Sequence, residues 1–442
     1  MRSGKVCVIA LLLFGFSRAQ NATTGQKLFC YYDGSFSQRE EYARVTLEDI
    51  DGALPFCTHL IYGYAGVNAT THRLSSLNPQ FDLDAGKGFF RDITSLKTRF
   101  PDLKVFLSVG GNLKLREKQT SQKYLRLLES EDARKAFVAS AYALLKTYNF
   151  DGLDLAWQFP QTKPKRIRAW PGQVWNGIKK IFTDESVLDP KANDHREQFA
   201  ALVRDLKNAF AQDQFQLMFT QLPHVNQTIF LDIPLLKDSL DYVNVAVYDQ
   251  QTPERNPKEG DYYAPIYRPS ERASGNSLDG MVNAWSSQGT PLDKIVVGIA
   301  AYGRGWKLVE ESGTTGVPPI RADGPSAPAA YTDTPGFYSF SEVCFRIRNL
   351  PVPTKDFKGE RPLTKVEDPT KRFGPYAYRF PAYNQIGIWL SYENPDSVGY
   401  KAAYVKAKGL AGISINDLAL DDYRGLYYDQ KFPIVRAVKD NL

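Results

Sequence analysis

The stretch FDGLDLAWQFP, residues Phe150–Pro160, decides the fold class. Because successive side chains of a β-strand point to opposite sides, Asp154, Ala156 and Gln158 are predicted to share the inward side, and Trp157 lies on the side of the helices. A polar row near the C-terminal end of an inward-facing strand marks the position of a site in a barrel. A packed polar layer of the core has the same pattern.

Seven other short apolar runs are bounded by turn residues: KLFCYY, THLIYGYAGV, LKVFLSVGG, FQLMFTQL, YVNVAVYD, KIVVGIAAYG and LAGISIND. Most are apolar nearly throughout, as expected for parallel strands covered on both faces. Helix-like segments separate them, and one of these begins after Ser130, a typical N-cap residue. Eight repeats of strand and helix predict an α/β fold, a (β/α)8 or TIM barrel. A doubly wound sheet is the alternative, but no glycine-rich nucleotide motif follows the first strand.

The chain has 442 residues, whereas such a barrel requires only about 250, so insertions are predicted. Residues 161–193 follow the fourth strand, and residues 306–388 form a predicted small α+β module between strands seven and eight. The part from 161 to 183 contains six Lys and Arg residues, two Trp residues and no acidic residue. We expect it to contact an acidic glycan or a receptor. A solvated loop, with some Trp packing on the barrel, is the alternative.

The N-terminal sequence MRSGKVCVIALLLFGFSRAQ has the pattern of a signal peptide, residues 1–19, with cleavage after Ala19. Its apolar run is shorter than the about 20 residues that span a bilayer, so the mature chain, residues 20–442, is predicted to be secreted without a membrane span. Loss of three basic residues lowers the formal net charge from +6 to +3. So small a charge does not indicate a nucleic acid partner.

Cleavage also removes Cys7 and leaves three cysteines, an odd number for a secreted chain. Cys30 and Cys57 are a plausible disulfide in an oxidising compartment. Cys344 is then predicted to be a free thiol that is buried and inert, exposed, or paired to another molecule.

Sequons for N-glycosylation begin at Asn21, Asn68 and Asn226, and they are predicted acceptors where they lie on surface loops. The four histidines are scattered without the spacing of metal ligands, so neither a metal site nor a cofactor is predicted.

The strand DGLDLAWQFP resembles the signature strand of the family 18 chitinases, D-G-x-D-x-D-W-E. The phrases YYD, FCTHLIYGYA, SVGG, AYGR and GLAGISINDLALDD, and the pair Tyr248-Asp249, agree with the same family strand by strand. The Gln in the signature, the insertion after strand four and the phrases TGVPP and DPTKRFGPYAY resemble the imaginal disc growth factor group of chitinase-like proteins. The resemblance covers essentially the whole mature chain.

Two departures from the signature decide what the resemblance implies for catalysis. In the family, the last Glu protonates the glycosidic oxygen and the preceding Asp orients the substrate's N-acetyl group. These positions are Gln158 and Ala156 here. An amide has no proton to transfer, and general acid catalysis contributes about 10²–10⁴ in rate. The resemblance thus implies no catalytic residue but a degenerate site at Asp151, Asp154, Ala156 and Gln158, where the two Asp residues hold the strand end.

The resemblance also implies candidate glycan-binding residues, which are Tyr32, Trp157, Tyr248, Asp249, Tyr302 and Arg304. These side chains either hold a short glycan or are retained barrel packing. Chitin-binding members usually place Trp residues where this chain has Asn112 and Asn416, which argues against tight chitin binding. Members also usually carry a Cys at the position of Tyr427, so Cys344 lacks the partner that the family provides.

The function that the resemblance implies is that of a secreted, catalytically inactive growth factor, which promotes cell proliferation through an unidentified cell-surface receptor or glycan. A lectin that binds chitooligosaccharides or other glycans without signalling is the first alternative. A weak glycoside hydrolase is the second.

Overall fold

The structure is a computed structural model, and it describes residues 25–111, 118–160, 189–270, 272, 277–348, 361–382, 384–428 and 430–442. The predicted signal peptide, Asn21, Asn112 and the basic segment 161–183 lie outside the described residues.

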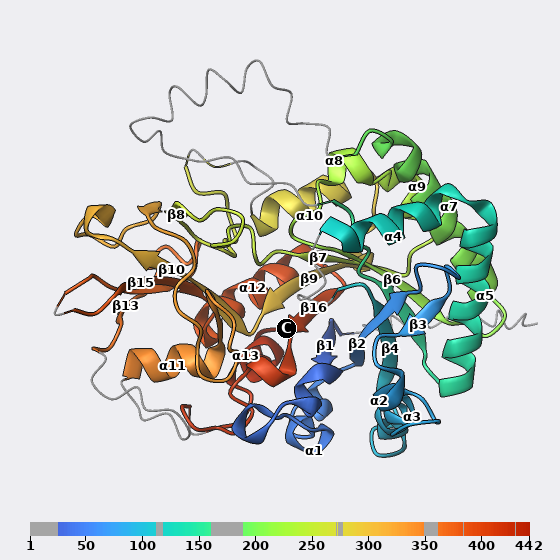
Figure 1. The fold of residues 1–442 in the computed structure, drawn as a ribbon, viewed down its shortest axis with the longest axis horizontal. Helices are drawn as coiled ribbons and strands as arrows, with labels where there is room; N and C mark the ends of the chain where they lie inside the picture. The colour runs from blue at the N-terminus through green and yellow to red at the C-terminus, as the bar shows by residue number, and fades with distance from the viewer. Residues whose placement is uncertain are drawn as a thin grey trace, which may run out of the picture.

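Eight parallel strands form a closed barrel, which confirms the predicted fold class (Figure 1). They are β1 (Lys27–Asp33), β2 (His59–Val67), β4 (Lys104–Val109), β5 (Gly152–Leu155), β6 (Gln216–Gln221), β7 (Tyr242–Ala246), β9 (Ile295–Ala300) and β16 (Gly412–Asn416). Strand β1 pairs in parallel with both β2 and β16, so this sheet has no free edge and is not a doubly wound sheet. A short antiparallel strand, β3 (Leu74–Ser76), extends β2 beyond the barrel.

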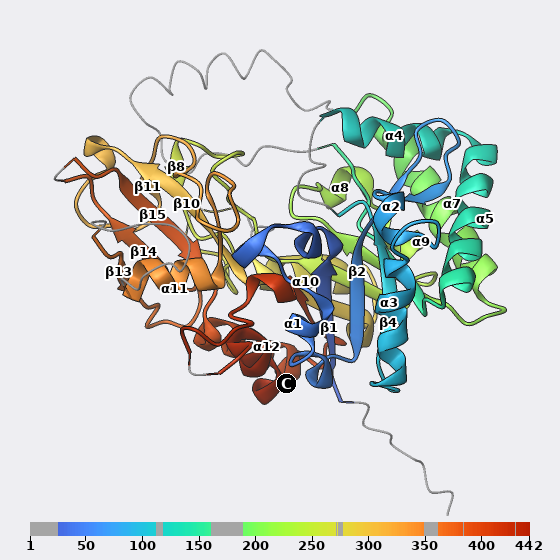
Figure 2. The ribbon, with the colours of Figure 1, turned by 60° about the horizontal axis from the view of Figure 1, so that its bottom comes forward.

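Helices cover the outside of the barrel (Figures 1 and 2). The longer ones are α4 (Lys118–Glu129), α5 (Glu131–Tyr148), α7 (Ala192–Phe210), α10 (Leu278–Ser286), α12 (Pro395–Lys408) and α13 (Pro433–Asn441), and the shorter ones are α1 (Leu47–Ile50), α2 (Pro79–Asp82), α3 (Phe89–Ser95), α8 (Gln227–Phe230) and α9 (Ile233–Leu236). Ser130 is the N-cap of α5, as the sequence predicts, and its hydroxyl accepts a hydrogen bond from the amide of Ala133. No helix of the described part is long and apolar enough to cross a membrane.

A separate five-stranded antiparallel sheet lies between β9 and β16 in the sequence and beside the barrel in space, on the left of Figures 1 and 2. Its strands are β10 (Tyr302–Leu308), β12 (Phe337–Ser339), β13 (Thr364–Val366), β14 (Tyr376–Arg379) and β15 (Gly387–Tyr392), with helix α11 (Phe340–Arg348). Buried side chains on one face pack with α11, and Trp306 and Trp389 pack on the other face. Two further short strands, β8 (Glu259–Gly260) and β11 (Ile320–Arg321), pair with each other.

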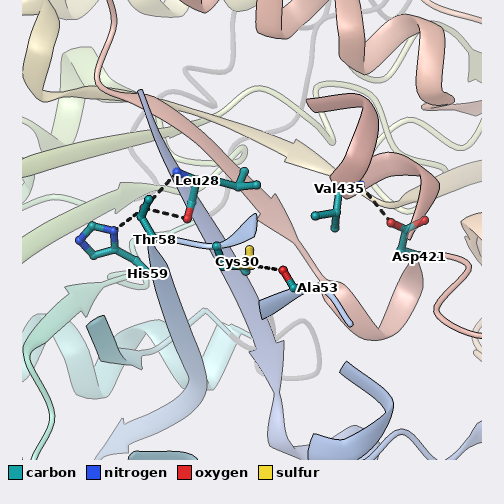
Figure 3. The surroundings of a disulfide bond; sticks show 8 residues. Leu28, Cys30, Ala53, Thr58, His59, Asp421 and Val435 are labelled. Atoms are coloured by element: carbon teal, nitrogen blue, oxygen red, sulfur yellow. Dashed lines mark hydrogen bonds between the residues drawn. A yellow bond between two sulfur atoms is a disulfide. The ribbon is translucent and has the colours of Figure 1, made fainter. Parts of the chain in front are cut away.

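The start of the barrel is tied to the loop before β2 by a disulfide between Cys30 and Cys57, whose Cα atoms are 6.0 Å apart (Figure 3). In the chain-entropy account, closing a loop of this length stabilises the fold by about 3 kcal/mol. The hydroxyl of Thr58 adds a second link, because it accepts from the amide of Leu28 at 3.1 Å and donates to the carbonyl oxygen of Leu28 at 3.0 Å.

The third cysteine of the predicted mature chain, Cys344, lies in α11 and is 5% exposed. It is a free thiol, and burial raises its pKa well above the usual value of a thiol. The neighbouring Phe345 packs edge to face on Tyr427 with ring centroids 4.3 Å apart. Aromatic packing therefore joins α11 to the C-terminal segment at Tyr427.

Candidate functional site at the barrel mouth

A network of polar side chains fills the middle of the barrel beneath its C-terminal end. Asp154 of β5 accepts hydrogen bonds from the hydroxyls of Tyr31 at 3.0 Å, Ser108 at 2.6 Å and Thr220 at 2.7 Å. Asn244 of β7 donates to the oxygens of Tyr31 and Thr220 at 3.2 and 3.1 Å. Five different strands meet in these bonds, so the network holds the barrel together across its axis.

Asp154 has no exposed surface, and burial raises the pKa of its carboxyl to about 6 although the hydroxyls of Ser108, Thr220 and Tyr31 lower it. A buried carboxylate with three donors is satisfied by its own neighbours. Asp154 does not belong to the lining of the cavity above it. We therefore assign Asp154 to the packing of the barrel.

Above this network is a cavity of about 20 Å³, called the mouth cavity here. It is lined by Tyr31, Tyr64, Gly111, Ala156, Thr220, Leu222, Pro223, Tyr248 and Asn416. One water needs about 10–15 Å³ by this measure, so the mouth cavity has room for about one water and not for a sugar ring. Its described lining contains no carboxylate.

The two positions that depart from the family signature both lie at this level of the barrel. Ala156 is 2% exposed and presents a methyl group to the mouth cavity. Gln158 is 3% exposed, and its amide nitrogen donates a hydrogen bond to the carbonyl oxygen of Gly110. The amide of Gln158 thus connects the ends of two neighbouring strands, and it has no proton to give to a leaving group.

Three of the candidate glycan-binding residues form one buried cluster. The guanidinium of Arg304 donates to both carboxylate oxygens of Asp249 at 2.7 Å, and the hydroxyl of Tyr302 donates to the same carboxylate at 3.0 Å. Burial acts to lower the pKa of Arg304, but the charge and hydrogen bonds of Asp249 raise it above its usual value. Tyr248 packs edge to face on Tyr302, with centroids 5.8 Å apart, and lines the mouth cavity.

Two other candidate glycan-binding residues, Tyr32 and Trp157, point away from the mouth. Tyr32 is fully buried, and its hydroxyl donates to the carbonyl oxygen of Val45 at 2.8 Å. The indole of Trp157 is also fully buried, and it packs against Tyr124 of α4 and Phe199 of α7. The outward phase of their strands places both rings among the helices, so neither offers a surface to a glycan at the mouth.

Asp151 belongs to the opposite end of the barrel. It precedes β5, and its carboxylate forms an ion pair with Lys97 at 3.0 Å and accepts from the amide of Val105 at 2.7 Å. Five residue steps along the strand lead from Asp151 to Ala156, which corresponds to about 16 Å at about 3.3 Å per residue. Asp151 therefore stabilises the N-terminal end of β5 and is not part of the degenerate site at the mouth.

Sequence reasoning missed two tyrosines that the structure brings to the mouth. Tyr31, not its neighbour Tyr32, points inward from β1, and Tyr64 lines the mouth cavity from β2. The amide of Asn416 approaches the hydroxyl of Tyr64 at 3.4 Å. The adjacent pair of tyrosines in YYD left the phase of the strand ambiguous, and only pairing with β2 and β16 decides it.

Two predicted glycosylation residues lie within the described part. Asn68 is exposed in the turn between β2 and β3, where its side-chain oxygen accepts from the amides of Thr70 and Thr71 at 3.0 and 2.9 Å. Asn226 is partly buried, because its side-chain oxygen caps the short helix α8. Asn68 is therefore the more accessible acceptor of the two.

Comparisons with known proteins agree with this geometry. The family described as Glycosyl hydrolases family 18 matches residues 27–421. Among solved structures, catalytic domain 2 of the Group II chitinase of Ostrinia furnacalis is 27% identical with a TM-score of 0.75, covering 94% of this chain and 96% of that chain.

Curated relatives narrow the family. "Bacteria-responsive protein 1" of Aedes aegypti is 61% identical over 98% of both chains. "Chitinase-like protein Idgf4" of Drosophila melanogaster is 47% identical over 98% of this chain and 99% of its own length, and "Imaginal disk growth factor 6" of the same species is 46% identical over 94% and 93%. The chain therefore belongs to glycosyl hydrolase family 18 and, within it, to the imaginal disc growth factor group of chitinase-like proteins.

Proposed function

We propose that this chain is a secreted, catalytically inactive chitinase-like growth factor, which promotes cell proliferation through a cell-surface receptor or a glycan. The observation that carries the proposal is the chemistry of the barrel mouth. The described lining of the mouth cavity has no carboxylate, and Gln158 is bonded to Gly110 where hydrolytic members hold their acid. Full-length relatives named as imaginal disc growth factors support the signalling half of the proposal.

The inactive barrel is tested by hydrolysis of a fluorogenic chitooligosaccharide. We expect no release of fluorophore above buffer from the mature chain. We expect the same from Ala156→Asp combined with Gln158→Glu, because restoring the acids leaves a mouth cavity of about 20 Å³. Turnover by the wild-type chain would contradict the proposal. Turnover by the double variant alone would show instead that the mouth opens to substrate.

The growth-factor activity is tested by adding the purified mature chain to cultured insect cells and counting cells against dose. We expect a dose-dependent rise in cell number that a heat-denatured sample does not produce. The double variant described above is the matched control, since a signalling surface separate from the mouth predicts that its effect equals that of the wild-type chain. No rise in cell number at any dose would reject the growth-factor proposal.

The lectin alternative predicts glycan binding without proliferation. A glycan array that includes chitooligosaccharides, set beside the cell count, separates the two functions.

We propose an acidic glycan as the partner of the basic segment 161–183. Retention on heparin should fall with rising salt, and it should fall further when Lys163, Lys165, Arg166 and Arg168 are replaced by Gln.

A second candidate function follows from the relative at 61% identity, which is named for its response to bacteria. If the chain has this function, its abundance should rise after injection of bacteria and not after injection of buffer.

The growth-factor proposal includes secretion, cleavage after Ala19 and glycosylation at Asn68. Mass spectrometry of the chain from culture medium tests all three.

A further inference from the structure

A second cavity, of about 150 Å³, lies where the inserted sheet meets helix α12, and it is called the junction cavity here. One wall is the segment 367–375, which joins β13 to β14, and the other is the first two turns of α12 with Ile266. In Figures 1 and 2, α12 lies between the inserted sheet and the barrel strands. The junction cavity is therefore built by both parts of the chain and is separate from the barrel mouth.

The loop that forms the first wall is held in shape by Asp368. The carboxylate of Asp368 accepts from the backbone amides of Thr370 at 2.9 Å, Arg372 at 2.7 Å, Phe373 at 2.5 Å and Gly374 at 3.2 Å. Although burial raises the pKa of Asp368, the hydrogen bond from the Thr370 hydroxyl at 2.6 Å and those from the backbone amides lower it below its usual value. A carboxylate bonded in this way stabilises the loop and leaves little capacity for a ligand.

The second wall is equally preformed. Lys401 is 1% exposed, forms an ion pair with the buried Glu393 and donates to the carbonyl oxygen of Ala264 at 2.7 Å. Asn394 and Ser397 form a capping box at the start of α12. These groups satisfy one another, so a ligand would enter a cavity whose walls do not need to be built on binding.

Three polar groups of the lining make no ion pair or hydrogen bond with the described residues. Asp396 is exposed and makes no ion pair or hydrogen bond with them. The ammonium of Lys371 lies 5.0 Å from the ring centroid of Tyr400, and neither the ammonium nor the Tyr400 hydroxyl has a hydrogen-bond partner in the described part. The junction cavity thus offers an acceptor, a donor and a hydroxyl on its rim.

The volume, the charge and the walls of the junction cavity together limit its ligand. An apolar cavity of about 150 Å³ holds benzene, so this volume takes the six atoms of a pyranose ring while the exocyclic groups of the sugar lie at the open rim. The lining carries three carboxylates and two ammonium groups, but Asp368 is bonded to backbone amides, Glu367 pairs with Lys365 and Lys401 pairs with Glu393. The charges left open are one of each sign, Lys371 and Asp396, so a strongly charged ligand gains little. Ile266, Pro375 and the ring of Tyr400 add an apolar wall beside these polar groups.

We propose that the junction cavity binds one neutral hexose ring, either a free monosaccharide or the terminal unit of a glycan. Each hydroxyl of a sugar both donates and accepts, which suits a rim that carries the Asp396 carboxylate and the Lys371 ammonium. The proposal rests on a glycan being a partner of the chain, as in the proposed function, and adds a contact for a neutral sugar unit that is separate from the segment 161–183. The mouth cavity of about 20 Å³ has no room for such a ring, whereas the junction cavity of about 150 Å³ has.

The test is titration calorimetry of the full mature chain with N-acetylglucosamine, glucose and chitotriose. We expect Asp396→Asn and Lys371→Gln each to weaken sugar binding by about tenfold or more, because each removes a charged hydrogen-bonding partner. Asp440→Asn and Lys406→Gln are matched controls on exposed helical positions, and both should bind as the wild-type chain does. Tighter binding of chitotriose than of the monosaccharides supports the terminal unit of a glycan, and equal binding supports a free ring.

Three outcomes would overturn this inference. They are no heat of binding with any of the three sugars, unchanged affinity in both junction variants, and loss of binding in Asn416→Leu, which alters only the mouth cavity. Thermal unfolding of each variant shows whether it is folded. If sugars do not bind but the mature chain still raises cell number, the junction site is rejected while the growth-factor proposal stands.

Discussion

The mouth cavity and the junction cavity show two uses of polar side chains in one chain. Beneath the mouth cavity, Asp154 has no exposed surface, and its carboxylate is bonded by the hydroxyls of Tyr31 and Thr220, which are nearly fully buried. At the junction cavity, the charged ends of Lys371 and Asp396 make no ion pair or hydrogen bond in the described part. Polar groups that satisfy each other stabilise the fold, and polar groups left open are available to a ligand.

The difference has a geometric origin. Strands of a barrel converge on its axis, so side chains from five strands reach one another and close the space between them. At the junction, a loop lies against a helix, and the side chains of these two elements leave a cavity of about 150 Å³ between them. Stability measurements on single variants test this difference between the two cavities.

The largest effect is expected from Arg304→Met, which leaves the carboxylate of Asp249 buried without its partner. Removing one member of a buried pair costs about 3–5 kcal/mol of the free energy of unfolding. Urea denaturation of the variant and the wild-type chain measures the cost. A double variant that also carries Asp249→Asn should recover part of it, and a loss below about 1 kcal/mol in the single variant would contradict the buried cluster.

The next effect concerns pH. The folded-state pKa of Asp154 is raised to about 6, so the stability that its protonated form contributes is fully present below about pH 4 and is lost as the pH rises through about 6. Asp154→Asn removes this titration. The free energy of unfolding of the variant, relative to the wild-type chain, should therefore rise between pH 4 and 7 by on the order of 2–3 kcal/mol. A difference that does not change with pH would contradict a raised pKa.

A smaller effect is expected from the tyrosine pair that the sequence left ambiguous. Tyr31→Phe removes a hydroxyl that bonds the Asp154 carboxylate and should cost about 1.5–3 kcal/mol of unfolding free energy. Tyr32→Phe is the matched control, because its hydroxyl donates to a neutral acceptor, the carbonyl oxygen of Val45, and it should cost about 1 kcal/mol. If the two variants lost the same unfolding free energy, or if Tyr32→Phe lost more, the assignment of Tyr31 to the inward side of β1 would be contradicted.

The smallest effect is expected at the junction cavity. Asp396→Asn and Lys371→Gln should change the free energy of unfolding by less than about 1 kcal/mol, because Lys371 loses only its contact with the Tyr400 ring and Asp396 only its charge in the first turn of α12. The same two variants should lose sugar binding. Destabilisation of either variant by more than about 1 kcal/mol would assign that side chain to the fold instead of a ligand.

Much of the barrel could be predicted from the sequence because each strand carries its own signal. Apolar runs at regular intervals indicate strands covered on both sides, and alternation around Asp154 placed Ala156 and Gln158 on the inward side. Alternation also placed Trp157 on the side of the helices, where the structure has it, although the resemblance made it a candidate glycan-binding residue. Tyr32 was a candidate as well, and the structure turns it away from the barrel axis.

The fold class, the family and the amide at position 158 follow from the sequence alone, because strand patterns and residue identities are local properties. Tertiary structure decided that Asp151 lies at the far end of the barrel and that the mouth has room for about one water. It also decided that an open cavity lies beside α12, between the segment 367–375 and Lys401. Empty space depends on how distant segments pack against one another, and no residue or motif encodes that space alone.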